Sequence, residues 1–144
     1  MMPSTIVLLL ALLVGCASHG PRVAFGPLAD GLDAFLSRHA AEKGQSIRVD
    51  EVGRTATASY HVAQIAGSEA PHRHGAHDLT VFVLRGRGTL TLGGKAVPLR
   101  AGDAAVIPRG EVHWFARAGR ASAVSLVVFT PPLDAPDLEP ADLR

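Results

Sequence analysis

Three histidines on two separated segments constrain the fold of this chain most. His72 and His74 stand two positions apart in the triplet His72-Arg73-His74, and His113 closes the segment 102–113. Alternate residues of a β-strand point to the same face, so the two histidines share a face if the triplet is extended. Neutral imidazole is the commonest metal ligand in proteins. A fold that brings His113 beside the triplet would therefore close a metal site.

The sequence from Ile47 onward predicts short β-strands joined by turns. Its segments are rich in Val, Thr and Ala and are separated by glycines. Gly93-Gly94 predicts a two-residue hairpin turn, since both positions of a type I′ turn need positive φ. With a single cysteine and no intramolecular disulfide, so many short strands favour an antiparallel architecture that covers its own edges. The predicted strands are 47–52, 56–65, 79–84, 89–92, 96–99, 104–107, 113–116 and 121–129.

Length and charge narrow the possible functions. A chain of 144 residues has room for one domain. Its 14 Lys and Arg side chains balance 13 Asp and Glu, and no basic run stands out. The sequence therefore lacks the excess or cluster of basic residues that is typical of nucleic-acid-binding proteins, and we exclude that class.

The amino-terminal residues predict export. The apolar run 6–14 has nine residues, fewer than the roughly twenty that span a bilayer, and suits the core of a signal peptide over residues 1–15. The run leads into Leu13–Cys16, which resembles the lipobox of bacterial lipoproteins. The resemblance implies a lipid on Cys16, a membrane anchor, and, from Ala17, placement on the outer membrane facing the periplasm. The alternatives are a plain cleaved signal peptide and a buried structural cysteine.

The remaining segments flank or form the predicted β-domain. Residues 16–27 are rich in Gly, Pro and small side chains and are expected to form a tether. An amphipathic helix is expected over 28–44, on the outside of a barrel formed by 45–130. The tail 131–144 has too many prolines for a regular strand and is expected to be extended. The helical periodicity rests on Leu28, Leu32, Phe35, Leu36 and His39.

The glycines and histidines together resemble one superfamily. Gly102-x5-Pro108-x-Gly110-x2-His113 matches the core of the second motif of the cupins. The pair His72-x-His74 stands where the first cupin motif places two metal ligands. The chain thus resembles a small, single-domain, type 2-like cupin. The resemblance implies an all-β jelly-roll barrel, here with one short N-terminal helix, that commonly holds a divalent metal on three histidines and one glutamate.

The fourth ligand is where this chain departs from that pattern. The position of the family's glutamate is occupied by Leu79, which cannot bind a metal. His77 has the same strand parity as Leu79 and is our preferred fourth ligand. Asp78 is the alternative, but it would ligate only if a bulge shifted the register. Three arrangements stay open: three histidines alone, four histidines, or three histidines with Asp78.

Two classes of function fit these features. The first is a metal-dependent enzyme acting on a small molecule, for example a dioxygenase of the kind this superfamily includes. The second is a non-catalytic module that binds a small ligand or a metal at the membrane. Imidazole ligands suit Fe, Mn, Ni, Cu and Zn, so ligand type does not select the metal. The catalytic residues stay unassigned, and the resemblance allows a homodimer.

Overall fold

Two five-stranded antiparallel sheets form the body of the protein. The computed structural model describes residues 21–25 and 28–142. Sheet I has the order β12 (Leu138–Pro140), β5 (His72–His74), β10 (His113–Arg117), β7 (Arg87–Leu92) and β8 (Lys95–Arg100). Sheet II has the order β3 (Ile47–Arg54), β4 (Ser59–Ile65), β11 (Ala123–Thr130), β6 (Asp78–Arg85) and β9 (Ala104–Ile107).

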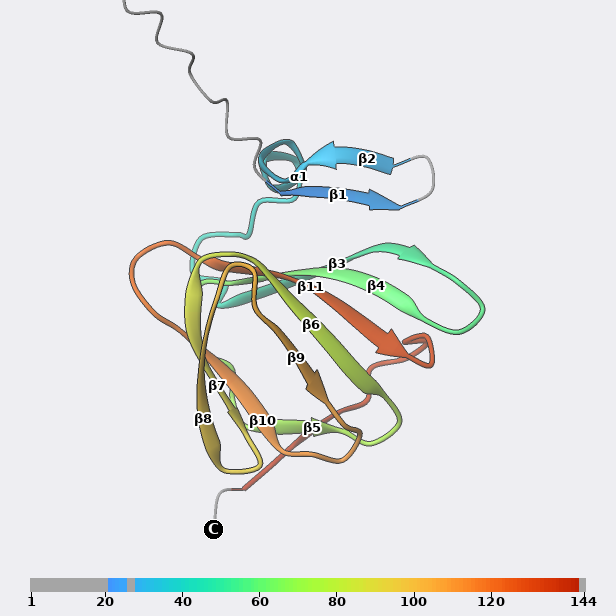
Figure 1. The fold of residues 1–144 in the computed structure, drawn as a ribbon, viewed down its shortest axis with the longest axis vertical. Helices are drawn as coiled ribbons and strands as arrows, with labels where there is room; N and C mark the ends of the chain where they lie inside the picture. The colour runs from blue at the N-terminus through green and yellow to red at the C-terminus, as the bar shows by residue number, and fades with distance from the viewer. Residues whose placement is uncertain (1–20, 26–27, 143–144) are drawn as a thin grey trace, which may run out of the picture.

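The chain crosses repeatedly between the two sheets (Figure 1), so that most strands consecutive in sequence belong to opposite sheets. This is a jelly roll, and the predicted all-β class is confirmed. The β7–β8 hairpin turns at Gly93 and Gly94, whose φ values of 53° and 78° are both positive, as the sequence predicted.

The main core lies between the sheets, and strand parity divides the side chains of β4. Ala63 and Ile65 face the inter-sheet core, whereas Val62 points to the opposite face and is fully buried there. Leu32 and Phe35 of α1 (Leu32–Arg38) cover Val62 on that outer face. The helix therefore packs on the outside of the barrel, where Figure 1 shows it beside the β3 and β4 end of sheet II.

The predicted helix over 28–44 is wrong in its extent. Its first turn is replaced by β2 (Leu28–Gly31), which pairs with β1 (Arg22–Phe25), and the helix itself ends at Arg38. Pairing with β1 satisfies the backbone groups of 28–31 in a ladder, which local periodicity could not foresee. The same hairpin places a strand inside the expected tether 16–27.

The predicted extended tail 131–144 also contains regular structure. Its residues 138–140 form β12, which pairs with β5 so that Leu138 lies opposite His74 and Pro140 opposite His72. A proline is tolerated here because β12 is an edge strand and Pro140 ends it. The tail is thereby brought against the strand that carries two of the predicted ligands.

Several predictions concern the amino-terminal segment, which lies outside the described residues. These are the signal peptide 1–15, the Leu13–Cys16 lipobox and the acylated Cys16. Within residues 21–25 and 28–142, no helix has the length and apolar character that crossing a membrane requires.

Candidate metal centre

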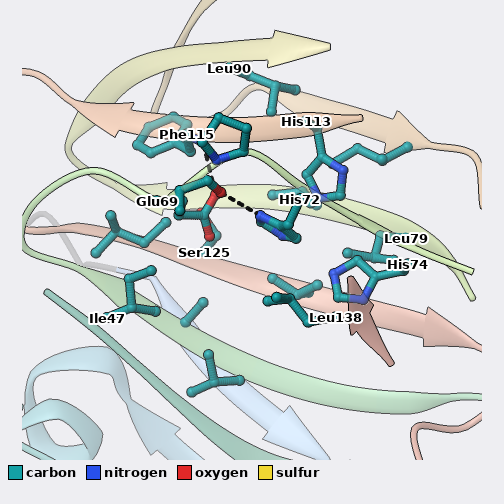
Figure 2. A pocket seen from close by; sticks show the side chains of 18 of the residues that line it. Ile47, Glu69, His72, His74, Leu79, Leu90, His113, Phe115, Ser125 and Leu138 are labelled. Atoms are coloured by element: carbon teal, nitrogen blue, oxygen red, sulfur yellow. Dashed lines mark hydrogen bonds between the residues drawn. The ribbon is translucent and has the colours of Figure 1, made fainter. Parts of the chain in front are cut away.

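The structure brings the three predicted histidines together at one end of the space between the sheets. His72 and His74 lie on β5, and His113 is the first residue of β10, directly opposite His72 in the register. All three side chains are buried. Figure 2 shows them converging from two strands of sheet I on one region of the cavity.

The turn before β10 explains why His113 arrives here. Pro108 ends the extended path after β9, and Gly110 adopts a φ of 78°, which favours glycine. The Gly110 N–H donates to the carbonyl oxygen of His74 at 2.7 Å. This backbone bond ties the glycine turn of the second segment directly to a histidine of the first.

Each of the three rings has its Nδ1 atom held by an oxygen that can only accept. The Nδ1 of His72 lies 2.8 Å from the Ala70 carbonyl, and that of His113 lies 3.0 Å from the Glu111 carbonyl. The Nδ1 of His74 lies 2.7 Å from a carboxylate oxygen of Asp137. The Nδ1 atoms therefore carry the hydrogens, and each Nε2 lone pair is left free to bind a metal.

The donor set fits a divalent transition metal. The candidate ligand atoms of His72, His74 and His113 all lie within 4.8 Å of one another. Metal–nitrogen bonds of about 2.1 Å allow two ligand nitrogens to be at most about 4 Å apart. Ring rotations that move the nitrogens by about an ångström or less would therefore close the site.

Burial keeps the imidazoles of His74 and His113 neutral. It lowers the pKa of His113 to about 4, although the hydrogen bond to the Glu111 carbonyl acts in the opposite direction. Burial also lowers the pKa of His74, against the raising effect of Asp137. At neutral pH both rings are therefore in the form that binds metal ions.

These shifts predict how the stability of the metal-free protein depends on pH. The unfolded chain takes up a proton at His113 near pH 6.5, whereas the folded chain does so only near pH 4. Stability should therefore fall as pH drops through this window, and His113 should contribute about 3 kcal/mol of that loss. Urea unfolding of the chelator-treated protein at several pH values measures this slope. A flat profile between pH 6.5 and 4 would contradict this prediction, and His113→Asn should make the pH dependence shallower, because the contribution of His74 remains.

His77, the preferred fourth ligand, lies outside the cluster. Its Nδ1 is 2.5 Å from a carboxylate oxygen of Asp137, and its Nε2 is 3.3 Å from the Pro132 carbonyl. Strand parity does not apply to His77, because β5 ends at His74 and β6 begins at Asp78. The ring therefore turns toward the carboxyl-terminal tail.

Asp78, the alternative fourth ligand, faces the surface. Its carboxylate pairs with the Arg109 guanidinium at 2.7 Å and accepts the Arg109 backbone N–H at 2.8 Å. These hydrogen bonds hold the pKa of Asp78 at about 2. Asp78 pairs with Thr130 of β11 in regular register, so no bulge turns its side chain inward. The neighbouring Leu79 lines the cavity instead, as strand alternation predicted. Three ligand arrangements were left open by the sequence. Among the described residues, the candidate ligands that lie close together are the three histidines alone.

Two acidic residues near the site were not predicted. Asp137, in the tail, bridges His74 and His77 with its two oxygens and accepts the Ala76 N–H at 3.2 Å. Glu69, before β5, lines the cavity, and its carboxylate accepts the Phe115 N–H at 2.8 Å. Burial raises the pKa of Glu69. No local pattern marks either residue, because their partners are distant in the sequence.

A cavity of about 370 Å³ adjoins the three histidines. It lies between the sheets, and strands of both sheets contribute to its wall (Figure 2). A cavity of this size accommodates a small organic molecule. A molecule in this cavity would lie beside the three histidines.

Comparisons with known proteins agree with this architecture. The family model described as "Cupin domain" matches residues 59–129. An uncharacterized protein of Aquifex aeolicus (strain VF5) is 40% identical over 93 residues, which are 65% of this chain and 76% of that protein.

Solved structures share the fold at lower identity. KdgF from Halomonas sp. has a TM-score of 0.60 and 24% identity, with 68% of this chain and 91% of that chain covered. TT1209 from Thermus thermophilus has a TM-score of 0.59 and 24% identity, with 67% and 94% covered. Streptomyces PAC13, solved with uridine, has a TM-score of 0.58 and 17% identity, with 70% and 82% covered. The matched family model, together with the shared fold, shows that this chain belongs to the cupin superfamily.

Proposed function

We propose that this protein holds one divalent transition metal on His72, His74 and His113 and acts as a metal-dependent enzyme on a small molecule. The observation that carries the proposal is that the Nε2 atoms of all three histidines are left free beside the cavity between the sheets. A bound metal would supply Lewis acidity and open coordination positions for substrate, and for O₂ if the reaction is a dioxygenation.

The residues of the chain have separate parts in this proposal. The Ala70 and Glu111 carbonyls and the Asp137 carboxylate orient the three rings. The apolar wall keeps water away from the bound molecule. Glu69 lines the same cavity, and burial raises the pKa of its carboxyl, so this group is suited to accept and return a proton.

Structural neighbours lend support without naming a reaction. They include a Streptomyces nucleoside dehydratase and a polyketide cyclase from Streptomyces resistomycificus, both cupin-fold enzymes under 25% identical to this chain. The fold therefore accommodates enzymes, but the substrates of these proteins are not carried over.

Metal loading and turnover test the proposal together. The purified protein should contain about one metal ion per chain after reconstitution with Fe(II), Mn(II), Ni(II), Cu(II) or Zn(II) in turn, measured by elemental analysis. The Fe(II) form should then consume O₂ when catechol, a small chelating probe, is added. Absence of stoichiometric metal in all five samples would overturn the proposal. Stoichiometric metal without catechol-dependent O₂ consumption would support the non-catalytic binding module.

We also propose that the protein is a lipoprotein on the periplasmic side of the outer membrane. Support comes from the apolar run 6–14 and the Leu13–Cys16 tetrapeptide of the sequence. The full chain, prepared for the metal assay, should fractionate with membranes, and Cys16→Ser should move it to the soluble fraction. Light scattering of the same preparation measures whether the protein forms the homodimer that the resemblance to cupins allows. Recovery of the unaltered full chain in the soluble fraction would contradict the lipid anchor.

A further inference from the structure

The wall of the cavity is almost entirely apolar. Among its described lining residues, the polar side chains are the three histidines, Glu69 and Ser125. The wall beyond them is aliphatic or aromatic, so a molecule with several hydroxyl or charged groups would lose its hydration without compensating hydrogen bonds. The wall includes Leu79, Val83, Leu90, Ile107, Val127 and Phe129.

Glu69 is held firmly within this apolar wall. Its backbone N–H donates to the Phe115 carbonyl at 2.9 Å, and one of its carboxylate oxygens accepts the Phe115 N–H at 2.8 Å. The other carboxylate oxygen accepts no hydrogen bond from the residues that the structure describes. Figure 2 shows Glu69 near His72 and Phe115 at the cavity. The free oxygen is thus a fixed acceptor without a partner.

The rim of the cavity is also apolar. Val49 of β3 and Leu138 of β12 line the cavity, yet they are 51% and 56% exposed. They belong to opposite sheets. Exposed apolar side chains on both sides of an opening favour the entry of an apolar molecule.

We infer that the cavity binds a compact, largely apolar molecule that carries one hydrogen-bond donor, such as a hydroxyl group, which Glu69 accepts. This inference rests on the proposed function and deepens it by naming the class of substrate. The apolar body of the molecule contacts the aliphatic wall, and its donor meets the free oxygen of Glu69. An analogue without the donor leaves that oxygen desolvated and unpaired, and it therefore binds more weakly.

Three probe compounds test the class of ligand. 2-Naphthol carries a hydroxyl donor on an apolar body, 2-methoxynaphthalene has the same body without the donor, and uridine is a polar control. Affinities are measured by titration calorimetry at pH 8 with metal-free and zinc-loaded protein. In the metal-free protein we expect 2-naphthol to bind about tenfold more tightly than its methyl ether, and uridine to show no measurable binding.

Glu69→Gln tests the acceptor itself. The glutamine carbonyl can accept the Phe115 N–H, which turns the amide NH₂ toward the cavity and replaces an acceptor by a donor. The tenfold preference for 2-naphthol should disappear, while zinc binding per chain stays unchanged. Glu42→Gln makes the same change in charge outside the cavity and should keep the preference.

The outcomes separate this inference from the proposed function. Equal binding of the two naphthalenes to the unaltered protein, tighter binding of uridine, or no binding of either naphthalene would overturn the inference even if zinc binds normally. An unchanged preference in Glu69→Gln would also overturn it. Failure of zinc and of the other four metals to bind would refute the proposed metal site but leave the metal-free preference measurable. If Glu69→Gln does not fold, the comparison in the unaltered protein still decides.

Discussion

Replacing His113 with alanine is expected to abolish metal retention. The ring is 3% exposed, lies opposite His72 in the β5–β10 register, and provides one of the three candidate ligands. Removing a residue that only orients a metal ligand lowers metal affinity by roughly 10–100-fold. Removing the ligand itself should lower the affinity further. Elemental analysis after equilibration against a competing chelator measures the loss. His113→Ala with full metal content would refute the three-histidine site.

His77→Ala and Asp78→Ala are the matched controls for this prediction. His77 is as buried as the ligands but faces Asp137 and Pro132, and Asp78 pairs with Arg109 at the surface. Both variants should keep about one metal per chain. Loss of metal in His77→Ala alone would show that His77 is the fourth ligand. Loss of metal in Asp78→Ala alone would show that the Asp78 carboxylate is the fourth ligand.

Asp137→Asn should weaken metal binding about 10–100-fold. The carboxylate accepts hydrogen bonds from the Nδ1 atoms of His74 and His77 and from the Ala76 N–H. An asparagine has one acceptor oxygen, and its NH₂ group would face an imidazole N–H. One ring must then rotate or change tautomer, so His74 no longer presents Nε2 reliably. A competition titration with zinc and a chromogenic chelator measures the affinity.

The same substitution should lower the free energy of unfolding of the metal-free protein by about 1–3 kcal/mol, because buried donors lose their acceptor. Urea unfolding measures this change. Asp134→Asn is the control in the same tail, since Asp134 is highly exposed and pairs only with Arg54 among the described residues. Asp134→Asn should bind zinc within about twofold of the unaltered protein. Equal zinc affinities for the two variants would rule out an orienting role for Asp137.

Much of the site was predictable because its signals are local. The glycine turn at Gly110, the strand that starts at His113 and the alternation of His72 with His74 each depend on a few adjacent residues. The resemblance to cupins joined these segments and correctly indicated a jelly roll. The Gly93-Gly94 hairpin was predictable for the same reason, since positive φ at two successive positions is a local property.

Other features depended on contacts that no local pattern encodes. The helix was predicted too long because pairing with β1 competes for residues 28–31. Strand parity pointed to His77, but the chain between β5 and β6 is not a strand, and the ring turned toward the tail.

Local signals were enough to predict the fold class and the three histidines, because periodicity, turn chemistry and motif spacing are carried by neighbouring residues. The surroundings of these histidines depend on the tertiary structure. It paired the tail with β5, which placed Asp137 against His74, and it pinned Glu69 to Phe115 inside an apolar wall. Backbone ladders bring together residues that are distant in the sequence, and a single side chain such as Asp137 or Glu69 gives no local signal of the partner that it will contact.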